Sequence, residues 1–152
     1  RSGAPRHEEA GRMTYLVDTG PLVSAFARRE PKFKSWAEEL LGRLPLPLVT
    51  CEAVITEASH LLGSSVRLME AIDKKLIVCR FDLQREARFI GQLCAKYADQ
   101  PMDLADACLV RLYETHREGS ATIVTVDRTD FTVYRTSKGK SLQCEFPPAD
   151  RK

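Results

Sequence analysis

The chain has 152 residues, of which 43% are hydrophobic and 29% are charged, and its formal net charge is +2. This length is enough for one domain with a substantial core, and the composition is that of a globular protein rather than of a disordered or fibrous chain. The small net charge gives no support by itself to nucleic-acid binding, although a local basic patch is compatible with it.

The two ends of the chain are interpreted as lying outside the domain. Residues 1–12 are polar, contain glycine and proline, and lack the apolar core of a signal peptide. We interpret them as a cloning remnant or flexible leader, with Met13 as the natural start, and place the domain at residues 13–146. Residues 147–152 are expected to form a loose tail.

The chain is expected to be a cytoplasmic protein without membrane contact. No apolar run approaches the roughly 18 residues of a membrane helix. The five cysteines are widely spaced and include no C-x-x-C pair. This pattern favours buried free thiols in a reducing compartment over disulfides or a metal site.

Strand-like and helix-like stretches alternate along the chain. The apolar runs predict strands at 15–18, 48–50, 76–79 and 121–127, with shorter β-like pieces at 131–135 and 142–146. Apolar residues at helical spacing predict helices at 22–29, 32–44, 52–62, 66–74, 83–97 and 103–117. This alternation predicts an α/β fold, a single Rossmann-like domain with a mostly parallel sheet flanked by helices.

Two of the predicted strands end in an aspartate. Asp18 follows Tyr-Leu-Val, and Asp127 follows a longer apolar run. In open α/β sheets the carboxyl edge of the strands is where ligands bind. We therefore expect the two carboxylates to converge at this edge.

Two predicted helices carry carboxylates beside their apolar stripes. Glu57 takes the i+3 place in a stripe of Val54, Ala58, Leu61 and Leu62. A buried, unpaired carboxylate is costly, so Glu57 either needs a cation or lies at the boundary and reaches solvent or an arginine.

The second of these helices opens with Asp103 and Asp106. The two residues lie three positions apart and so face the same way at its first turn. Asp103 is a good N-cap, whereas Asp106 is too far inside the helix for that role.

Four or five carboxylates at one sheet edge would repel one another strongly without cations. An all-oxygen set of ligands suits Mg²⁺ or Mn²⁺ rather than Zn²⁺. Such a site suits phosphodiester hydrolysis, because a divalent ion lowers the pKa of a water and stabilises charge on the phosphate.

Four stretches of the chain, taken together, resemble the PIN-domain ribonucleases and in particular the VapC-type toxins of bacterial toxin–antitoxin pairs. They occur in the family's order and cover nearly the whole domain. They are YLVDTGPL at 15–22, TEASHLL at 56–62, MDLADACLVR at 102–111 and TVDRTDF at 125–131.

The resemblance implies an acidic metal site and a nuclease activity. Its expected catalytic and metal-binding residues are Asp18, Glu57, Asp106 and Asp127, with auxiliary roles for Asp103, Asp130, Thr19 and Thr125. It further implies Mg²⁺- or Mn²⁺-dependent cleavage of single-stranded RNA, a homodimer, and inhibition by a small antitoxin protein. The toxin role itself is usually assigned from a neighbouring antitoxin gene rather than from these motifs.

Two groups of basic residues are candidates for RNA phosphate contact. The interpretation as ordinary solvated surface charge stays open for each of them. Arg111 is a candidate to pair with a site carboxylate. The first group is Arg28, Arg29, Lys32 and Lys34, and the second is Arg128, Arg135, Lys138 and Lys140.

Two other functions remain as alternatives. One is a catalytically inactive PIN-like module that binds RNA or acts as a scaffold, although all four expected carboxylates are present. The other is a phosphatase or response-regulator receiver, which also places aspartates at strand ends. The phosphatase needs a second Asp two residues after the first, where this chain has Gly20, and the receiver needs an acidic pair and a late lysine that are not evident.

Overall fold

A five-stranded, all-parallel sheet forms the centre of the molecule. The computed structural model describes residues 11–29, 31–100 and 102–149. The strand order is β3-β2-β1-β4-β5, and every neighbouring pair is parallel. The strands are β1 (Thr14–Val17), β2 (Leu48–Thr50), β3 (Ile77–Cys79), β4 (Ala121–Val124) and β5 (Cys144–Glu145).

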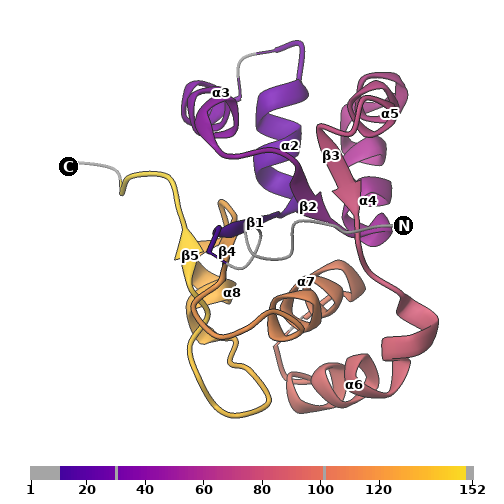
Figure 1. Cartoon of the computed structure of the whole chain (residues 1–152), viewed down its shortest axis with the longest axis vertical. Helices are drawn as coiled ribbons and strands as arrows, with labels where there is room; N and C mark the ends of the chain where they lie inside the picture. The colour runs from indigo at the N-terminus through magenta and orange to yellow at the C-terminus, as the bar shows by residue number, and fades with distance from the viewer. Residues whose placement is uncertain (1–10, 30, 101, 150–152) are drawn as a thin grey trace.

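Seven helices flank this sheet in the described part of the chain, which confirms the predicted α/β class. Figure 1 shows α2 and α3 on one side of the sheet and α6 and α7 on the other. None of these helices is long and apolar enough to cross a membrane. The helices are α2 (Thr19–Phe26), α3 (Lys34–Arg43), α4 (Glu52–Leu62), α5 (Val66–Asp73), α6 (Leu83–Lys96), α7 (Leu104–Glu114) and α8 (Arg128–Val133).

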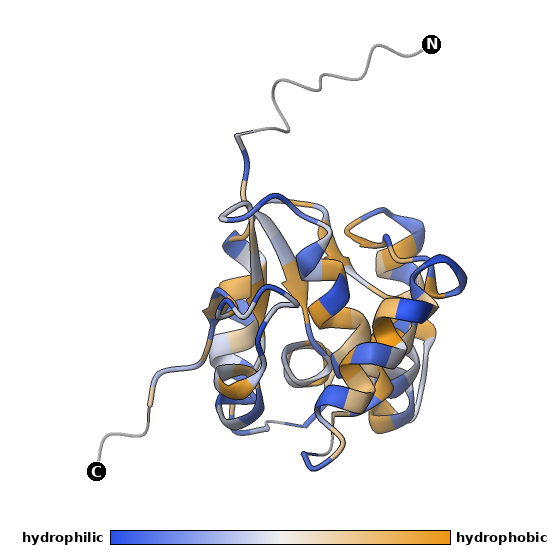
Figure 2. Ribbon diagram, turned by 90° about the horizontal axis from the view of Figure 1, so that it is seen from below, coloured by the Kyte–Doolittle hydropathy of each residue, from blue (hydrophilic) through white to orange (hydrophobic). Residues whose placement is uncertain are grey.

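The strands separate two apolar cores. Figure 2 shows that the helices carry both apolar and hydrophilic positions, as expected for helices with one face on a sheet. Leu16 and Val17 are adjacent on β1, point to opposite faces of the sheet, and are both fully buried. Val17 belongs to the core under α2 to α5, whereas Leu16 packs with residues of α7 and α8.

Aspartates begin four of the helices. The side chains of Asp18, Asp82, Asp103 and Asp127 each accept a hydrogen bond from a backbone N–H at the start of α2, α6, α7 and α8, respectively. These bonds satisfy N–H groups that have no partner within the helix.

Two predicted element boundaries are wrong because of such caps. The stretch 131–135 begins as helix rather than strand, because Asp127 starts α8 over Arg128–Val133, and Arg135 forms an isolated antiparallel bridge with Ser141. The first helix begins at Thr19 rather than at residue 22, because Asp18 caps it and proline is tolerated in a first helical turn.

Some residues assigned to apolar stripes are exposed. Leu61 in α4 is 60% exposed, and the buried residues of this helix are Val54, Ile55 and Ala58. At the start of the predicted tail, Pro147 is buried and its carbonyl accepts a hydrogen bond from Arg128, whereas residues 150–152 lie outside the described residues.

Candidate active site

The neighbouring strands β1 and β4 bring the first and last aspartates to one edge of the sheet. Leu16 pairs with Ile123 and Val17 with Val124, so both strands end at the same level. The backbone N–H of Asp18 donates to the carbonyl of Val124 at 2.9 Å. The segment after β4 therefore starts beside Asp18.

The carboxylate of Asp18 is buried, with 7% of the residue exposed, and both of its oxygens accept hydrogen bonds. Oδ1 accepts from the backbone N–H of Thr19 at 2.8 Å, and Oδ2 accepts from the hydroxyl of Thr125 at 2.6 Å. The same hydroxyl oxygen accepts from the backbone N–H of Asp127 at 3.0 Å. Thr125, for which the sequence suggested an auxiliary role, thus links the two strand-end aspartates.

Glu57 reaches this edge from α4. Its Oε2 accepts a hydrogen bond from the hydroxyl of Thr19 at 3.3 Å, and the residue is half-buried. Thr19 therefore contacts two of the predicted site carboxylates, one through its backbone and one through its side chain.

The first turn of α7 supplies two further carboxylates. Asp103 is exposed and acts as the N-cap, since its Oδ1 accepts from the backbone N–H of Asp106 at 2.8 Å. Asp106 is half-buried, and its Oδ2 accepts from the hydroxyl of Tyr134 at 2.8 Å.

The last pair of carboxylates lies at the start of α8. Asp127 is the N-cap, and its Oδ1 accepts from the backbone N–H of Asp130 at 2.9 Å. Desolvation, followed by a hydrogen bond to Asp127, raises the pKa of Asp130.

Burial and the charges of neighbouring acids both oppose ionisation of carboxylates that come from different elements. The pKa of Asp106 is raised to about 8, mainly by burial and also by the charges of Asp103, Asp18 and Asp127, against the opposing hydrogen bond from Tyr134. Burial also raises the pKa of Asp18 to about 6, with contributions from the charges of Glu57 and Asp103.

Glu57 behaves in the same way. Its pKa is raised by desolvation and then by the charge of Asp103. At neutral pH the cluster therefore carries less negative charge than its number of acids implies, unless a cation is bound.

No lysine or arginine in the described part of the chain forms an ion pair with these acids. Within the described ranges, the ion pairs join other residues, and none involves Asp18, Glu57, Asp103, Asp106, Asp127 or Asp130. Buried carboxylates without a cation are unfavourable, so the arrangement fits a bound divalent ion in its donor chemistry.

The fit is incomplete in geometry. Among residues 11–29, 31–100 and 102–149, no group of three or more His, Cys, Asp or Glu side chains is placed to hold one ion together. Mg²⁺ commonly uses only one or two carboxylates and keeps several waters. The carboxylates are therefore compatible with an ion that is bound by one or two of them and by water, although they do not form a complete coordination site.

A glycine allows the close approach of α2 to the end of β4. A Cβ atom added at Gly20 would lie 2.4 Å from Cγ2 of Val126. Gly20 lies two residues after Asp18, and Val126 directly precedes Asp127. This close contact therefore sets the distance between the segment of Asp18 and the segment of Asp127.

The basic residues predicted to contact RNA lie in different places. Arg28 and Arg29 are exposed and follow the C-terminal end of α2, about 12 Å along the helix axis from Asp18 at 1.5 Å per residue. Lys34 donates to the carbonyls of Ala25 and Ala27 and so caps the end of α2.

Arg128 is the basic residue nearest to the acids along the chain. It follows Asp127 directly and is exposed. Its guanidinium stacks on Phe146, 4.6 Å from the ring centroid, and donates to the carbonyl of Pro147 at 2.9 Å. Arg128 therefore holds the segment after β5 next to the sheet edge that carries Asp18 and Asp127. This edge, with the carboxylates that surround it, is called the acidic edge below.

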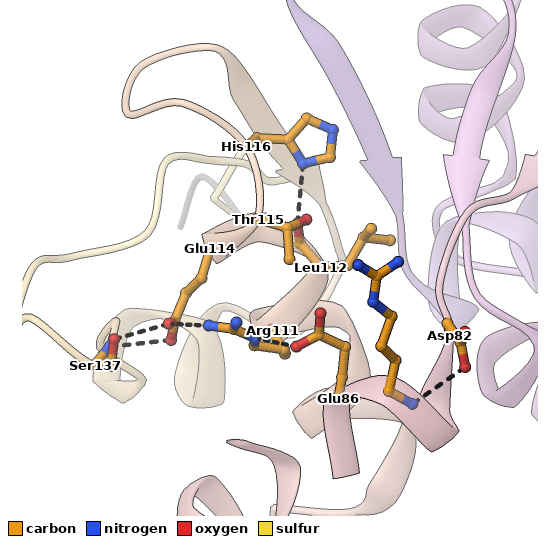
Figure 3. Close-up of polar contacts among 9 residues, drawn as sticks. Asp82, Glu86, Arg111, Leu112, Glu114, Thr115, His116 and Ser137 are labelled. Atoms are coloured by element: carbon orange, nitrogen blue, oxygen red, sulfur yellow. Dashed lines mark hydrogen bonds and ion pairs between the residues drawn. The ribbon is translucent and has the colours of Figure 1, made fainter. Parts of the chain in front are cut away.

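The expectation that Arg111 pairs with a site carboxylate is wrong. Figure 3 shows Arg111 between Glu86 and Glu114, and the N···O distances are 2.8 and 3.3 Å. Glu114 also accepts from the backbone N–H and the hydroxyl of Ser137. This network ties α6, α7 and the loop after α8 together at a distance from the acids.

A cavity of about 470 Å³ lies next to this network. Its lining comes from the C-terminal end of α7 and the loop before β5, and includes Arg117, Lys138 and Gln143. Since α7 begins at the acidic edge and ends at this cavity, the cavity is separate from the carboxylate cluster.

Two residues at the acidic edge were not predicted from the sequence. Tyr134 contacts Asp106, and the hydroxyl of Thr50 at the end of β2 donates to the carbonyl of Val17 at 2.8 Å. Thr50 could have been suspected from its place at the end of a predicted strand. Tyr134 is distant in sequence from Asp106, and no local pattern connects them.

No model of a known protein family matches the chain, and no curated protein matches its sequence.

Proposed function

We propose that the chain is a Mg²⁺- or Mn²⁺-dependent endoribonuclease that hydrolyses phosphodiester bonds of single-stranded RNA. The observation that supports this most directly is the cluster of carboxylates from β1, α4, α7 and the β4–α8 connection. Burial and mutual repulsion raise the pKa of several of them, and no lysine or arginine in the described ranges pairs with them.

The carboxylates of Asp18, Glu57, Asp106 and Asp127 would hold the ion. Once bound, the ion supplies a water of lowered pKa and offsets charge on the phosphate. Thr125 and Thr19 fix the orientation of Asp18 and Glu57, so these acids need little rearrangement to bind. Asp103 and Asp130 add negative charge at the rim.

Arg128 is the strongest candidate for contact with the RNA backbone. It is exposed beside Asp127, and its stacking on Phe146 holds the guanidinium in place. A cation here would offset the repulsion between an acidic site and a phosphate. Arg28 and Arg29 are weaker candidates because they lie at the far end of α2.

The remaining parts of the proposal rest on the resemblance to VapC-type toxins. On that basis, the chain is the toxin of a cytoplasmic toxin–antitoxin pair, acts as a homodimer, and is inhibited by a small antitoxin protein.

The activity is tested with purified protein and a single-stranded RNA that carries a fluorophore and a quencher. We expect cleavage with Mg²⁺ or Mn²⁺, none with EDTA, and a loss of at least about 100-fold in Asp18→Asn and Asp106→Asn. Glu118→Gln is the matched control, because Glu118 is exposed and pairs with Lys140 away from the cluster. Equal activity in all three variants would rule the proposal out.

A non-enzymatic module is the second candidate. The observation in its favour is that no three acidic or other metal-binding side chains in the described residues are placed to hold an ion together. This alternative predicts RNA binding that is unchanged by EDTA and by Asp18→Asn.

A further inference from the structure

Tyr134 connects an aromatic cluster to the acidic edge. The residue is fully buried, and its hydroxyl donates to Oδ2 of Asp106 at 2.8 Å. Tyr134 follows α8 directly, and its backbone N–H donates to the carbonyl of Asp130. One residue therefore joins the end of α8 to the first turn of α7.

The ring of Tyr134 is held on two sides. Tyr97, at the end of α6, and Phe131, in α8, each meet it edge-to-face with ring centroids 5.2 Å apart. The hydroxyl of Tyr97 accepts a hydrogen bond from the backbone N–H of Arg135 at 2.7 Å, which fixes the chain next to Tyr134. Such packing leaves the phenol little freedom to turn away from Asp106.

The hydroxyl of Tyr134 is the one hydrogen-bond donor to the Asp106 carboxylate within residues 11–29, 31–100 and 102–149. Oδ1 of Asp106 has no hydrogen-bond partner within those ranges, so it is available to a ligand. Asp18 differs, since it is held by both Thr19 and Thr125.

We propose that Tyr134 is a positioning residue of the cluster: its hydroxyl holds Asp106 in the orientation in which the second carboxylate oxygen binds a divalent ion. This inference rests on the proposed function. Partners that hydrogen-bond to metal ligands typically affect metal affinity by about 10–100-fold, and the hydroxyl of Tyr134 is such a partner of Asp106.

Tyr134→Phe removes the hydroxyl and keeps the ring. We expect Mn²⁺ binding, measured by calorimetry, to weaken by about 10-fold, and kcat to fall while KM for RNA stays unchanged. Tyr113→Phe is the matched control, because it also removes a tyrosine hydroxyl, one that accepts from the backbone N–H of Gln143, but lies near the other end of α7 from Asp106. Thermal melting of both variants reports any general loss of stability.

A spectroscopic readout does not depend on activity. Mn²⁺ binding to the unmodified protein should change the near-ultraviolet absorbance of tyrosine, and the change should persist in Tyr113→Phe and disappear in Tyr134→Phe. No change in the unmodified protein on Mn²⁺ binding would overturn the inference, even if Tyr134→Phe failed to fold.

The experiments give different results if the role of Tyr134 is wrong and if the proposed metal-dependent activity is wrong. If the unmodified protein binds Mn²⁺ and cleaves RNA, but Tyr134→Phe binds Mn²⁺ as tightly as Tyr113→Phe does, only the role of Tyr134 is wrong. If the unmodified protein binds no Mn²⁺, both are wrong.

Discussion

At the scale of single residues, the site consists of acids that are costly to keep charged. Asp18 is buried and its pKa is about 6, yet it accepts hydrogen bonds from Thr19 and Thr125. The hydrogen bonds orient the carboxylate, and burial in a cluster of like charge opposes its ionisation. This combination is typical of a carboxylate that binds a cation, rather than of one whose charge stabilises the metal-free protein.

Asp18→Asn should therefore stabilise the metal-free protein while it removes metal binding. The amide can still accept from the backbone of Thr19 and no longer carries a charge. Above pH 7 we expect the free energy of unfolding in EDTA to rise by about 1–3 kcal/mol, since a pH unit of pKa difference corresponds to about 1.4 kcal/mol. Urea unfolding measures this, and a clear decrease in stability would indicate a structural role for the charge.

Thr125 should be needed for both stability and positioning. Thr125→Val leaves Asp18 without its side-chain donor and the backbone N–H of Asp127 without its acceptor. We expect a loss of about 1.5–3 kcal/mol in urea unfolding. Thr125→Ser keeps the hydroxyl and serves as the control. A larger loss in Thr125→Ser than in Thr125→Val would point to packing of the methyl group, which valine keeps, instead of the hydrogen bonds.

Part of the residue-level site could be predicted from sequence. Asp18 and Asp127 were identifiable because each follows an apolar strand, and strand ends meet at one sheet edge. Glu57 was suspected from helical spacing, although the stripe used for the argument included the exposed Leu61. The contact of Tyr134 with Asp106 could not be predicted, because it depends on the path of the chain after β4.

At the scale of elements, the site depends on how closely α2 approaches the β4–α8 connection. Gly20→Ala would place a methyl group 2.4 Å from Val126 Cγ2. We expect a loss of about 1–3 kcal/mol in unfolding free energy, together with weaker Mn²⁺ binding, because relief of the clash moves Asp18 away from Asp127.

Gly91→Ala is the control for this change. Gly91 lies inside α6, and an added Cβ there meets nothing within 4 Å, so this variant should gain up to about 1 kcal/mol. The double change Gly20→Ala with Val126→Ala should restore metal binding, and failure to do so would mean that the contact does not set the site geometry.

The elements themselves were largely predictable, and α8 shows the limit. Phe131 to Arg135 contains aromatic and β-branched residues, which favour a strand. The structure forms a six-residue helix over most of this stretch because Asp127 caps it and Phe131 packs into the core beneath it. A cap interaction and tertiary packing outweighed the local preference.

At the scale of the whole molecule, the acids should give the metal-free protein an unusual dependence on pH. The folded pKa values of Asp18 and Asp106, about 6 and about 8, both lie above the ordinary value of 3.8. A raised folded pKa contributes stability that is fully present below the unfolded pKa and is lost as pH rises through the folded pKa. We expect this contribution to decline between about pH 4 and pH 8 in EDTA.

Urea unfolding across this range, with Asp18→Asn/Asp106→Asn as the reference, isolates the contribution. The unmodified protein should lose stability relative to the double variant as pH rises. A constant difference across the range would mean that the two carboxyl groups titrate normally.

The most direct test of the account is Mn²⁺ binding to the metal-free protein, measured by calorimetry near pH 7 in buffers of different ionisation enthalpy. The carboxylate cluster predicts saturable binding with release of protons, because the raised pKa of Asp106 leaves it protonated before the ion binds. Asp18→Asn should abolish the binding, whereas Glu118→Gln should keep it. Absence of binding in the unmodified protein, or unchanged binding in Asp18→Asn, would contradict the assignment of this sheet edge as a divalent-ion site.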